Sequence, residues 1–552
     1  MRLGATIPFL VRGAIAGLLV IFAAGLVFDP VGLRPEAQSA DATLHNEVKK
    51  LTGSGSGPFD GFGVSVAVSG DIAIVGEPYE GAGAAYVYER NAGGPGNWGE
   101  VKMLTASDAQ GSDFFGISVA ISGDTAVVGA RGEDAGGGSA GAAYVFRRDE
   151  GGTDNWGEVK KLTASDAEAN DWFGFNVAVS GDTAVVGAFQ EGATGAAYVF
   201  GRDVGGPDNW GEVKKLTASD AEPNDNFGRG VAVSGNTVVV GASLEDAGGN
   251  LAGAAYVFLQ DAGGADNWGE IKKLTASDAE TGDQFGLSVA VSGDTAVVGA
   301  FRENFTPDRF NVGAAYVFQR DLGGTENWGE VKKLRASDFH SQAFFGLSVA
   351  VAGDIAVVGA HLQSREFSNA GGAYIFVRHQ GGVDNWGEDK KLSASDASPE
   401  DRLGIGVAAS GGVALVGANG ALGFDTNPGA AYVFLTKQPD PGDTDGDGCS
   451  DQRENGPDET LGGQRDYKDP NDYYDVYGPG QSLVHDGVID LPNDILGVIQ
   501  HFSPAGAPPY DVRFDRGPTI GADHWQRAGP DGVIDLPNDI LGVTLQFGQN
   551  CV

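Results

Sequence analysis

Residues 173–188 read FGFNVAVSGDTAVVGA, and close copies of this stretch recur along most of the chain. The spacing between successive copies runs from 53 residues (Phe62 to Phe115) to 60 residues (Phe285 to Phe345). The Phe-Gly dipeptide opens six copies, and Leu403-Gly404 opens a seventh, weaker one; the six begin at Phe62, Phe115, Phe173, Phe227, Phe285 and Phe345. Because each copy contains only strand and turn signals, this period predicts a solenoid or a closed propeller.

Each copy predicts four β-strands. In the third copy, residues 176–180 and 183–188 are rich in Val and Ala and flank the tight turn Gly181-Asp182. Two further strands, over 195–200 and 212–216, follow loops rich in Gly, Asp and Asn. Four strands make one propeller blade, so the sequence predicts an all-β fold, a seven-bladed β-propeller spanning residues 44–436.

The two ends of the repeat region complement each other. Residues 47–51 (EVKKL) look like a fourth strand but precede the first Phe-Gly copy. The seventh copy ends at 430–434 (AAYVF) and has no fourth strand of its own. We therefore expect the N-terminal strand to complete the last blade and close the ring.

Two repeated features each allow two interpretations. Paired lysines on the expected outermost strands either discourage the addition of further strands or form a basic binding ring; they are Lys160-Lys161, Lys214-Lys215, Lys272-Lys273, Lys332-Lys333 and Lys390-Lys391. Tryptophan in the motif Asn-Trp-Gly-Glu either fills a gap between blades or stacks on sugars; the six copies are Trp98, Trp156, Trp210, Trp268, Trp328 and Trp386.

The pattern FG…VAVSGD…VVGA over residues 47–434 resembles the FG-GAP repeats of integrin alpha chains and of many bacterial exported proteins. This resemblance implies a ligand face made of the loops between second and third strands and the loops between blades. In integrins several of the hairpins hold a calcium-binding Asp-rich loop. Here the same turns are only Ser-Gly-Asp or Ser-Gly-Asn, so we expect no calcium at them.

Two loops of that face depart from the repeated template, 301–311 (FRENFTPDRFN) and 361–369 (HLQSREFSN). Specificity can be placed in such loops because the scaffold does not need them, although insertion drift explains them equally well. The residues expected to line the most selective part of the face are Arg302, Phe305, Arg309, Phe310, His361 and Arg365.

Charge and the N-terminus indicate an exported protein. The formal net charge of −39 repels phosphate backbones, so nucleic acid is not an expected partner. Residues 1–40 carry an uncharged run from 13 to 28 behind Arg2 and Arg12, which is typical of a signal peptide or an uncleaved anchor. We expect a secreted or cell-surface protein that touches a membrane only through that segment if it is retained. The two cysteines, Cys449 and Cys551, can then form one disulfide.

Residues 437–475 contain a linker and one strong metal-binding pattern. Residues 443–454 read DTDGDGCSDQRE, with oxygen ligands at loop positions 1, 3, 5, 7, 9 and 12 and Gly448 at the sharp turn. The expected Ca²⁺ ligands are Asp443, Asp445, Asp447, the Cys449 carbonyl, Asp451 and Glu454. This loop resembles those of thrombospondin type 3 repeats and dockerins.

Residues 476–552 hold a duplicated motif, DGVIDLPNDILGV, that begins at 486 and again at 531. Each copy predicts a short capped helix with an apolar stripe. The duplication is similar to dockerin halves and implies a cohesin-like docking partner. Two interpretations remain open, a structural helix pair or weaker calcium binding by Asp486, Asp490, Asp531 and Asp535.

The sequence contains no convincing catalytic constellation, so we do not expect an enzyme. The favoured function is calcium-dependent binding or adhesion outside the cell, with a protein or a glycan as ligand. The alternatives are an accessory or catalytic domain in extracellular glycan degradation and a structural surface-layer component. Carboxylates that face each other across the central channel would favour the enzyme, whereas a channel lined by aliphatic side chains would favour the binding protein.

Overall fold

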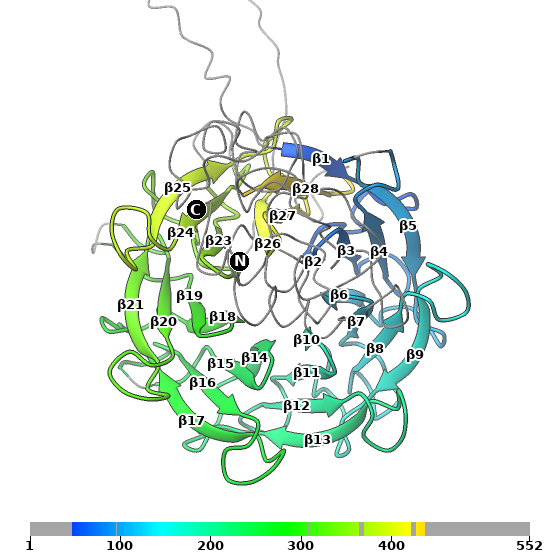
Figure 1. The fold of residues 1–552 in the computed structure, drawn as a ribbon, viewed down its shortest axis with the longest axis horizontal. Helices are drawn as coiled ribbons and strands as arrows, with labels where there is room; N and C mark the ends of the chain where they lie inside the picture. Colours follow the sequence, from blue (N-terminus) through cyan, green and yellow to red (C-terminus); the bar gives the residue numbers. More distant parts are fainter. Residues whose placement is uncertain are drawn as a thin grey trace, which may run out of the picture. The chain divides into compact units, whose positions relative to one another are not determined.

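The computed structural model describes residues 47–436, with gaps at 95, 247, 306–308, 364–368 and 421–426. Over this range the chain forms seven four-stranded antiparallel sheets, arranged as the blades of a ring (Figure 1). The predicted seven-bladed β-propeller is therefore confirmed. Within the described residues there is no helix long and apolar enough to cross a membrane.

In each blade the strands run outward in chain order from the central axis. Blade 1 contains β2 (Ser65–Ser69), β3 (Ile72–Glu77), β4 (Ala84–Glu89) and β5 (Gly99–Leu104). Blade 2 contains β6 (Phe115–Ser122), β7 (Thr125–Ala130), β8 (Ala142–Arg147) and β9 (Gly157–Leu162). Blade 3 contains β10 (Asn176–Ser180), β11 (Thr183–Ala188), β12 (Ala196–Gly201) and β13 (Gly211–Leu216). Blade 4 contains β14 (Phe227–Ser234), β15 (Thr237–Ala242), β16 (Ala254–Leu259) and β17 (Gly269–Leu274).

The remaining blades follow the same plan until the last strand. Blade 5 contains β18 (Phe285–Ser292), β19 (Thr295–Ala300), β20 (Ala314–Gln319) and β21 (Gly329–Leu334). Blade 6 contains β22 (Val349–Ala352), β23 (Ile355–Gly359), β24 (Ala373–Val377) and β25 (Gly387–Leu392). Blade 7 contains β26 (Leu403–Ser410), β27 (Val413–Ala418), β28 (Ala430–Leu435) and, on its outside, β1 (Glu47–Leu51).

Strand β1 closes the ring, as the sequence predicts. It pairs antiparallel with β28, with Lys49 opposite Val433 and Leu51 opposite Ala431 (Figure 1). The Glu47 carboxylate also accepts hydrogen bonds from the backbone N–H (2.8 Å) and the hydroxyl (3.1 Å) of Ser395. The first strand of the chain is thus held in the last blade by both backbone and side-chain bonds.

The repeated glycines exist because neighbouring blades meet backbone to backbone. A Cβ on Gly129 of blade 2 would lie 1.9 Å from the carbonyl oxygen of Gly174, which follows the phenylalanine of blade 3. The same clash, at 2.0 Å, would occur between Gly417 of blade 7 and Gly63 of blade 1. The Phe-Gly glycines additionally adopt positive φ, 84° at Gly174, which only glycine does without strain. The closing interface therefore has the same geometry as an internal one.

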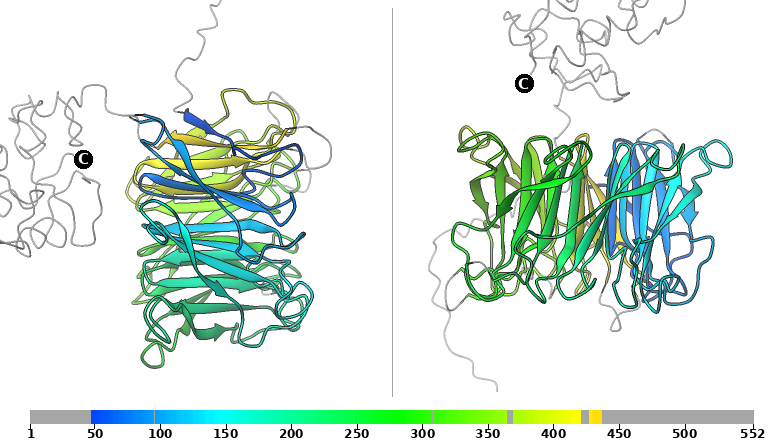
Figure 2. Two further views of the ribbon diagram at one scale, coloured as in Figure 1. Left: turned by 90° about the vertical axis from the view of Figure 1, so that its right-hand side faces the viewer. Right: turned by 90° about the horizontal axis from the view of Figure 1, so that it is seen from below.

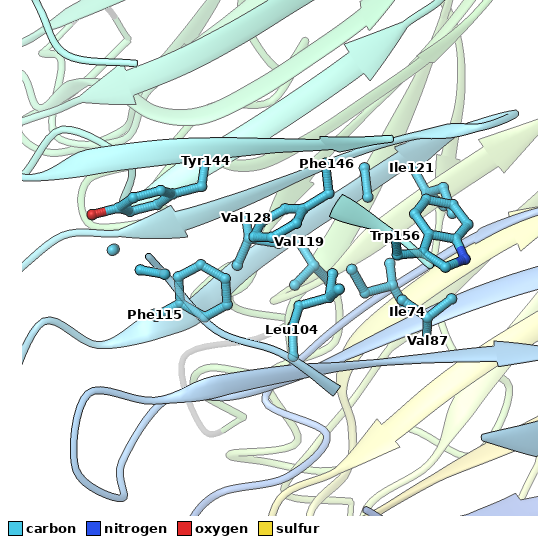
Figure 3. Packing of buried hydrophobic residues seen from close by; sticks show 14 of the residues in the cluster. Ile74, Val87, Leu104, Phe115, Val119, Ile121, Val128, Tyr144, Phe146 and Trp156 are labelled. Carbon is cyan, nitrogen blue, oxygen red and sulfur yellow. The ribbon is translucent and has the colours of Figure 1, made fainter. Parts of the chain in front are cut away.

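The hydrophobic core consists of seven clusters, one between each pair of adjacent blades. In the cluster between blades 1 and 2, Trp156 lies among Ile74, Val87 and Ile121 (Figure 3). All six tryptophans of the Asn-Trp-Gly-Glu motif are at most 3% exposed. The prediction that they fill gaps between blades is confirmed, and the sugar-stacking interpretation is wrong because their rings do not reach the surface.

The Ser-Gly-Asp turns join adjacent blades. The Ser122 hydroxyl of blade 2 accepts a hydrogen bond of 3.0 Å from the backbone N–H of Gly181 in blade 3. The Gly70 N–H of blade 1 donates in the same way to Ser410 of blade 7, at 3.0 Å. These turns lie on one face of the ring, and the loops between blades lie on the opposite face (Figure 2).

Candidate functional site

The face opposite the Ser-Gly-Asp turns carries the candidate site, and we call it the loop face. It consists of the loops from second to third strand and the loops that enter each blade. All of the strongly exposed aromatic side chains in the described part of the chain belong to these loops: Phe59 (46%), Tyr79 (36%), Phe305 (38%) and Phe310 (49%). The sequence also makes this face acidic, with motifs such as Ala-Ser-Asp-Ala at 106–109 and Glu-Asp-Ala at 133–135.

A repeated set of acidic groups on the loop face is held in ion pairs with lysines. In blade 2, the Lys161 ammonium lies 2.7 Å from both Asp108 and Glu133, and the Tyr144 hydroxyl donates to Asp108 at 2.7 Å. Five further blades repeat the Tyr-Asp-Lys part of this cluster: Tyr198, Asp166, Lys215; Tyr256, Asp220, Lys273; Tyr316, Asp278, Lys333; Tyr374, Asp338, Lys391; and Tyr432, Asp396, Lys50. In blade 7 the lysine comes from β1, so ring closure also completes this cluster.

The basic-ring interpretation of the paired lysines is therefore wrong, whereas protection of the sheet edge stays a prediction. The second lysine of each pair is bound to carboxylates rather than free to form a basic ring. The first lysine reaches the next blade, as where the Lys160 ammonium donates to the side-chain carbonyl of Asn209 at 3.0 Å. These aspartate and asparagine partners could not be predicted from the sequence, because each lies about 50 residues from its lysine.

The clusters set the ionisation of their members. Burial acts to raise the pKa of Asp108, but the hydrogen bonds from Lys161 and Tyr144 outweigh it, so the pKa falls below its usual value. Burial acts to lower the pKa of Lys161, yet the bonds to Asp108 and Glu133 raise it overall. Opposite charges at hydrogen-bond distance favour both charged forms.

Blade 1 lacks the cluster. Gly55 stands where the other blades have the aspartate, and Met103 stands where they have the lysine. The Tyr86 hydroxyl instead donates to the Glu77 carboxylate at 2.7 Å. Burial raises the pKa of Glu77, and hydrogen bonds from Ser56 and Tyr86 counteract this only in part. Blade 1 therefore lacks both the aspartate and the lysine of the ion pair, so neither charge is left without its partner.

A cavity of about 510 Å³ lies on the ring axis. Its lining comes from the innermost strand of every blade, mainly from the residue two places after each Phe-Gly or Leu-Gly glycine and its neighbours. Most of these side chains are aliphatic, and they include Val64, Ile117, Leu287, Leu347 and Ile405. No Asp or Glu is among the described residues that line it, and its charged members are Arg131 and Arg229.

The two arginines that line this cavity each contact two aromatic rings. The Arg131 guanidinium lies 4.3 Å from the ring centre of Phe114 and 5.0 Å from that of Trp172. Across the next blade boundary, the Trp172 and Phe189 rings meet edge to face with their centres 5.4 Å apart.

This chain of contacts continues beyond Phe189. The guanidinium of Arg229 lies 5.0 Å from the ring centre of Phe189 and 5.8 Å from that of Phe175. Such stacking contacts fix the plane of a guanidinium group while its N–H edges stay available.

Four of the residues predicted for the ligand face come from loop 301–311, and two of them, Phe305 and Arg309, form a small cluster with residues outside it. The Phe305 ring lies 4.4 Å from the Phe339 ring, and the Arg309 guanidinium lies 5.3 Å from the Phe339 centre. Arg335 stacks on Phe305 at 4.9 Å. Phe310 is exposed, and the N–H of Phe305 donates to the carbonyl of Arg309 at 3.0 Å, which closes the loop.

Of the other predicted residues, Arg302 and His361 contact a second pair of aromatic rings. Arg302 is exposed and stacks on Phe301 at 5.3 Å, and Phe301 contacts Phe344 at 5.7 Å. His361 stacks on Phe344 at 5.8 Å, and burial, with a contribution from Arg402, lowers the pKa of His361 to about 4. Arg365 lies outside the described residues. Ligand binding by all of these residues stays a prediction.

Arg131, Arg229 and Trp172 are not among the residues predicted from the sequence. A signal existed for Arg229, because the residue after Phe-Gly is apolar in every other copy. For Arg131 the signal was weaker, because the position after each Gly-Ala varies widely between copies. Only the ring geometry shows that the two arginines line one cavity.

Several predictions of metal and disulfide chemistry lie outside the described residues. These are the calcium loop 443–454, the duplicated motif with Asp486, Asp490, Asp531 and Asp535, and the disulfide between Cys449 and Cys551. Within 47–436 and its gaps, no group of three or more His, Cys, Asp or Glu side chains is arranged to hold a metal ion.

The fold and its paired interface glycines define a closed seven-bladed β-propeller, and comparison with known families identifies it further. The FG-GAP repeat model matches seven times and covers more than half of the chain, at residues 45–88, 98–146, 156–200, 210–258, 268–318, 328–376 and 386–434. The chain therefore belongs to the FG-GAP repeat family.

Other comparisons add little about function. No curated protein matches the sequence. Among solved structures, the chain is similar to the WD40 beta propeller domain of Doa1, with a TM-score of 0.41 and 11% identity over 71% of this chain and 97% of that one. This likeness carries no information about what the chain binds.

Proposed function

We propose that the chain is an exported, calcium-binding β-propeller that holds an extracellular protein or glycan on its loop face. The observation that carries this proposal is the placement of the exposed aromatic residues. Phe59, Tyr79, Phe305 and Phe310 all project from loop-face loops, whereas exposed side chains on the opposite face, such as Leu322 (46%) and Val383 (87%), are aliphatic. Aromatic side chains are enriched where proteins bind partners.

The scaffold under these residues favours binding because it is already ordered. The loops that enter the blades are tied down by the Tyr-Asp-Lys clusters and by bonds such as that from the Ser165 N–H to the Glu212 carboxylate, at 2.9 Å. A surface that needs little ordering when it binds loses less free energy on association.

The alternative, a domain in glycan degradation, has less support at the central cavity. Glycoside hydrolysis usually needs two carboxyl groups that flank the scissile bond. The described lining of the cavity offers aliphatic side chains and two arginines instead. Release of shortened glycans from a labelled substrate would favour this alternative.

The calcium part of the proposal rests on the sequence. The six oxygen ligands offered by Asp443, Asp445, Asp447, Cys449, Asp451 and Glu454 match the hard-oxygen set that Ca²⁺ prefers. Bound calcium would supply positive charge that offsets the repulsion between the carboxylates of this loop. Calorimetric titration of the full chain with CaCl₂ tests this, and D445N with D447N should remove the tightest binding step, whereas D486N with D531N should leave it in place.

The binding role is tested on arrays of glycans and extracellular-matrix proteins, probed with the full chain in calcium and again in chelator. F310A and L322A form a matched pair, because the two side chains have similar exposure, belong to the same blade and lie on opposite faces. We expect F310A to weaken capture of the array ligand at least fivefold and L322A to change it less than twofold. Equal effects of the two variants would contradict the assignment of binding to the loop face.

A further inference from the structure

Arg131 and Arg229 stand apart from most arginines in the described part of the chain because they have no carboxylate partner. Arg148, by contrast, lies within ion-pair distance of three carboxylates, at 3.0 Å from Glu89, 2.6 Å from Asp154 and 3.8 Å from Asp124. The protein has 75 acidic residues against 36 basic ones, so unpaired arginines are not the result of a shortage of carboxylates.

Both side chains are partly buried and incompletely hydrogen-bonded. Their Nε atoms are buried and have no hydrogen-bond partner. Burial lowers the pKa of the Arg131 guanidinium, with a small opposing effect of Tyr79. Burial also lowers the pKa of Arg229, and the nearby charge of Arg302 adds to this effect. Guanidinium groups stay charged in proteins, so the cavity holds two positive charges that a bound anion would stabilise.

The neighbouring rings hold these charges in place for an incoming group. Arg131 lies between Phe114 and Trp172, and Arg229 lies against Phe175 and Phe189. Stacking restricts the guanidinium planes and leaves their N–H edges for planar, bidentate acceptors. A carboxylate is the acceptor that fits this arrangement best.

We propose that the central cavity binds a single carboxylate carried on an apolar stem, with the Arg229 guanidinium holding the carboxylate, Arg131 adding a second positive charge to the lining, and the aliphatic side chains holding the stem. The inference rests on the proposed use of the loop face for binding and names the chemistry that the face selects. The volume of about 510 Å³ accommodates a group the size of an arylalkanoate. Val64, Ile117 and Leu287 supply the apolar wall.

The net charge of the protein argues for one anionic group rather than a polyanion. A long anionic chain would cross the acidic surface and be repelled by it. A single carboxylate inside the mouth is governed by the nearest charges, because salt at physiological strength screens interactions beyond about 8 Å. The ligand is either a free small carboxylate or the C-terminal carboxylate of a partner protein that ends in an apolar residue.

The test uses the full chain and calorimetric titration with 3-phenylpropionate, its neutral amide, and two peptides, acetyl-Gly-Gly-Phe with a free carboxylate and the same peptide amidated. We expect the carboxylates to bind and the amides to bind at least tenfold more weakly. Tighter binding of the free-carboxylate peptide than of phenylpropionate identifies a protein C-terminus as the source. The reverse order identifies a small molecule.

The variant R229Q should weaken carboxylate binding at least tenfold, and R229K should weaken it less because the charge is kept. R131Q should weaken binding less than R229Q, because Arg131 is separated from Arg229 by the rings of Trp172 and Phe189. R202Q is the matched control, since Arg202 is paired with Asp182 and Asp208 on the opposite face. Thermal unfolding without ligand confirms that each variant is folded. Absence of binding at 10 mM carboxylate, equal binding of acid and amide, or equal binding by R229Q and R202Q would overturn the proposal. In that event a selective effect of F310A on the array would leave the broader binding role intact.

Discussion

Replacing Trp156 by alanine tests how the blades are held together. The side chain is 1% exposed and packs between blades 1 and 2 with Ile74, Val87 and Ile121 (Figure 3). Burial of a tryptophan removes about 150–250 Å² from water, which at about 25 cal/mol per Å² is roughly 4–6 kcal/mol. Measured Trp→Ala losses in cores are about 3–5 kcal/mol, and we expect a loss in that range.

The expected loss translates into a modest but measurable shift in melting temperature. An unfolding entropy of about 2.1 cal/mol/K per residue over roughly 390 residues gives about 0.8 kcal/mol per degree. W156A should therefore melt about 4–6 °C below the parent in differential scanning calorimetry. W172A is the comparison, because Trp172 is only partly buried at the cavity mouth and should shift the melting temperature less. A shift below 1 °C for W156A would refute the inter-blade role of the repeated tryptophans.

Three further predictions concern closure, ionisation and the ion-pair clusters. L51A should lower the free energy of unfolding, measured with denaturant, by about 2.5–5 kcal/mol. L104A should lower it equally, because both leucines are 1% exposed at equivalent positions of an outermost strand. If L104A destabilised the protein and L51A did not, docking of β1 would be contradicted. Burial, aided by Glu303, raises the pKa of Asp283 to about 6. The folded state therefore takes up a proton more readily than the unfolded state, and the free energy of unfolding falls as pH rises from about 4 to 6. This fall should be smaller in D283N than in the parent by up to about 3 kcal/mol, and identical pH profiles of the two proteins would argue against a raised pKa. K215M should lower the free energy of unfolding by about 1–2 kcal/mol. Adding D166G, which reproduces the Met and Gly found at these positions in blade 1, should restore at least about 0.5 kcal/mol of it in a double-mutant cycle.

The fold could be predicted from the sequence because the same instructions are written seven times. Each Phe-Gly copy marks an inner strand, and the out-of-phase residues 47–51 could be assigned to the last blade because they match the other fourth strands. Strand ends differ from the predicted ones by about one residue, as at β12, which begins at Ala196 rather than 195. Repetition averages out the local ambiguity that limits most predictions from a single sequence.

The partners of charged residues could not be predicted in the same way. Lys161 binds Asp108, which lies 53 positions earlier in the chain, and only the packing of one blade on the next brings the two together. The pairing of lysine with aspartate and tyrosine also explains why Met103 and Gly55 change together in blade 1. Likewise, Arg131 and Arg229 come from different blades, and their shared cavity follows from closure of the ring.

Two of the loop residues singled out by their departure from the template are prominent on the loop face. Phe305 and Phe310 are exposed there, as their position between second and third strands requires. The ring geometry adds the belt of aromatic and arginine side chains, which the template comparison overlooked because its members occupy variable positions next to invariant glycines.

The most direct test of the account is a disulfide across the closing seam. Lys49 of β1 lies opposite Val433 of β28, so cysteines at both positions, in a chain with Cys449 and Cys551 replaced by serine, should be linked on oxidation. We expect mass mapping to find one K49C–V433C disulfide in the folded protein and calorimetry to show a higher melting temperature than in the reduced form. Two free thiols in the folded, oxidised protein would contradict a ring sealed by its own first strand.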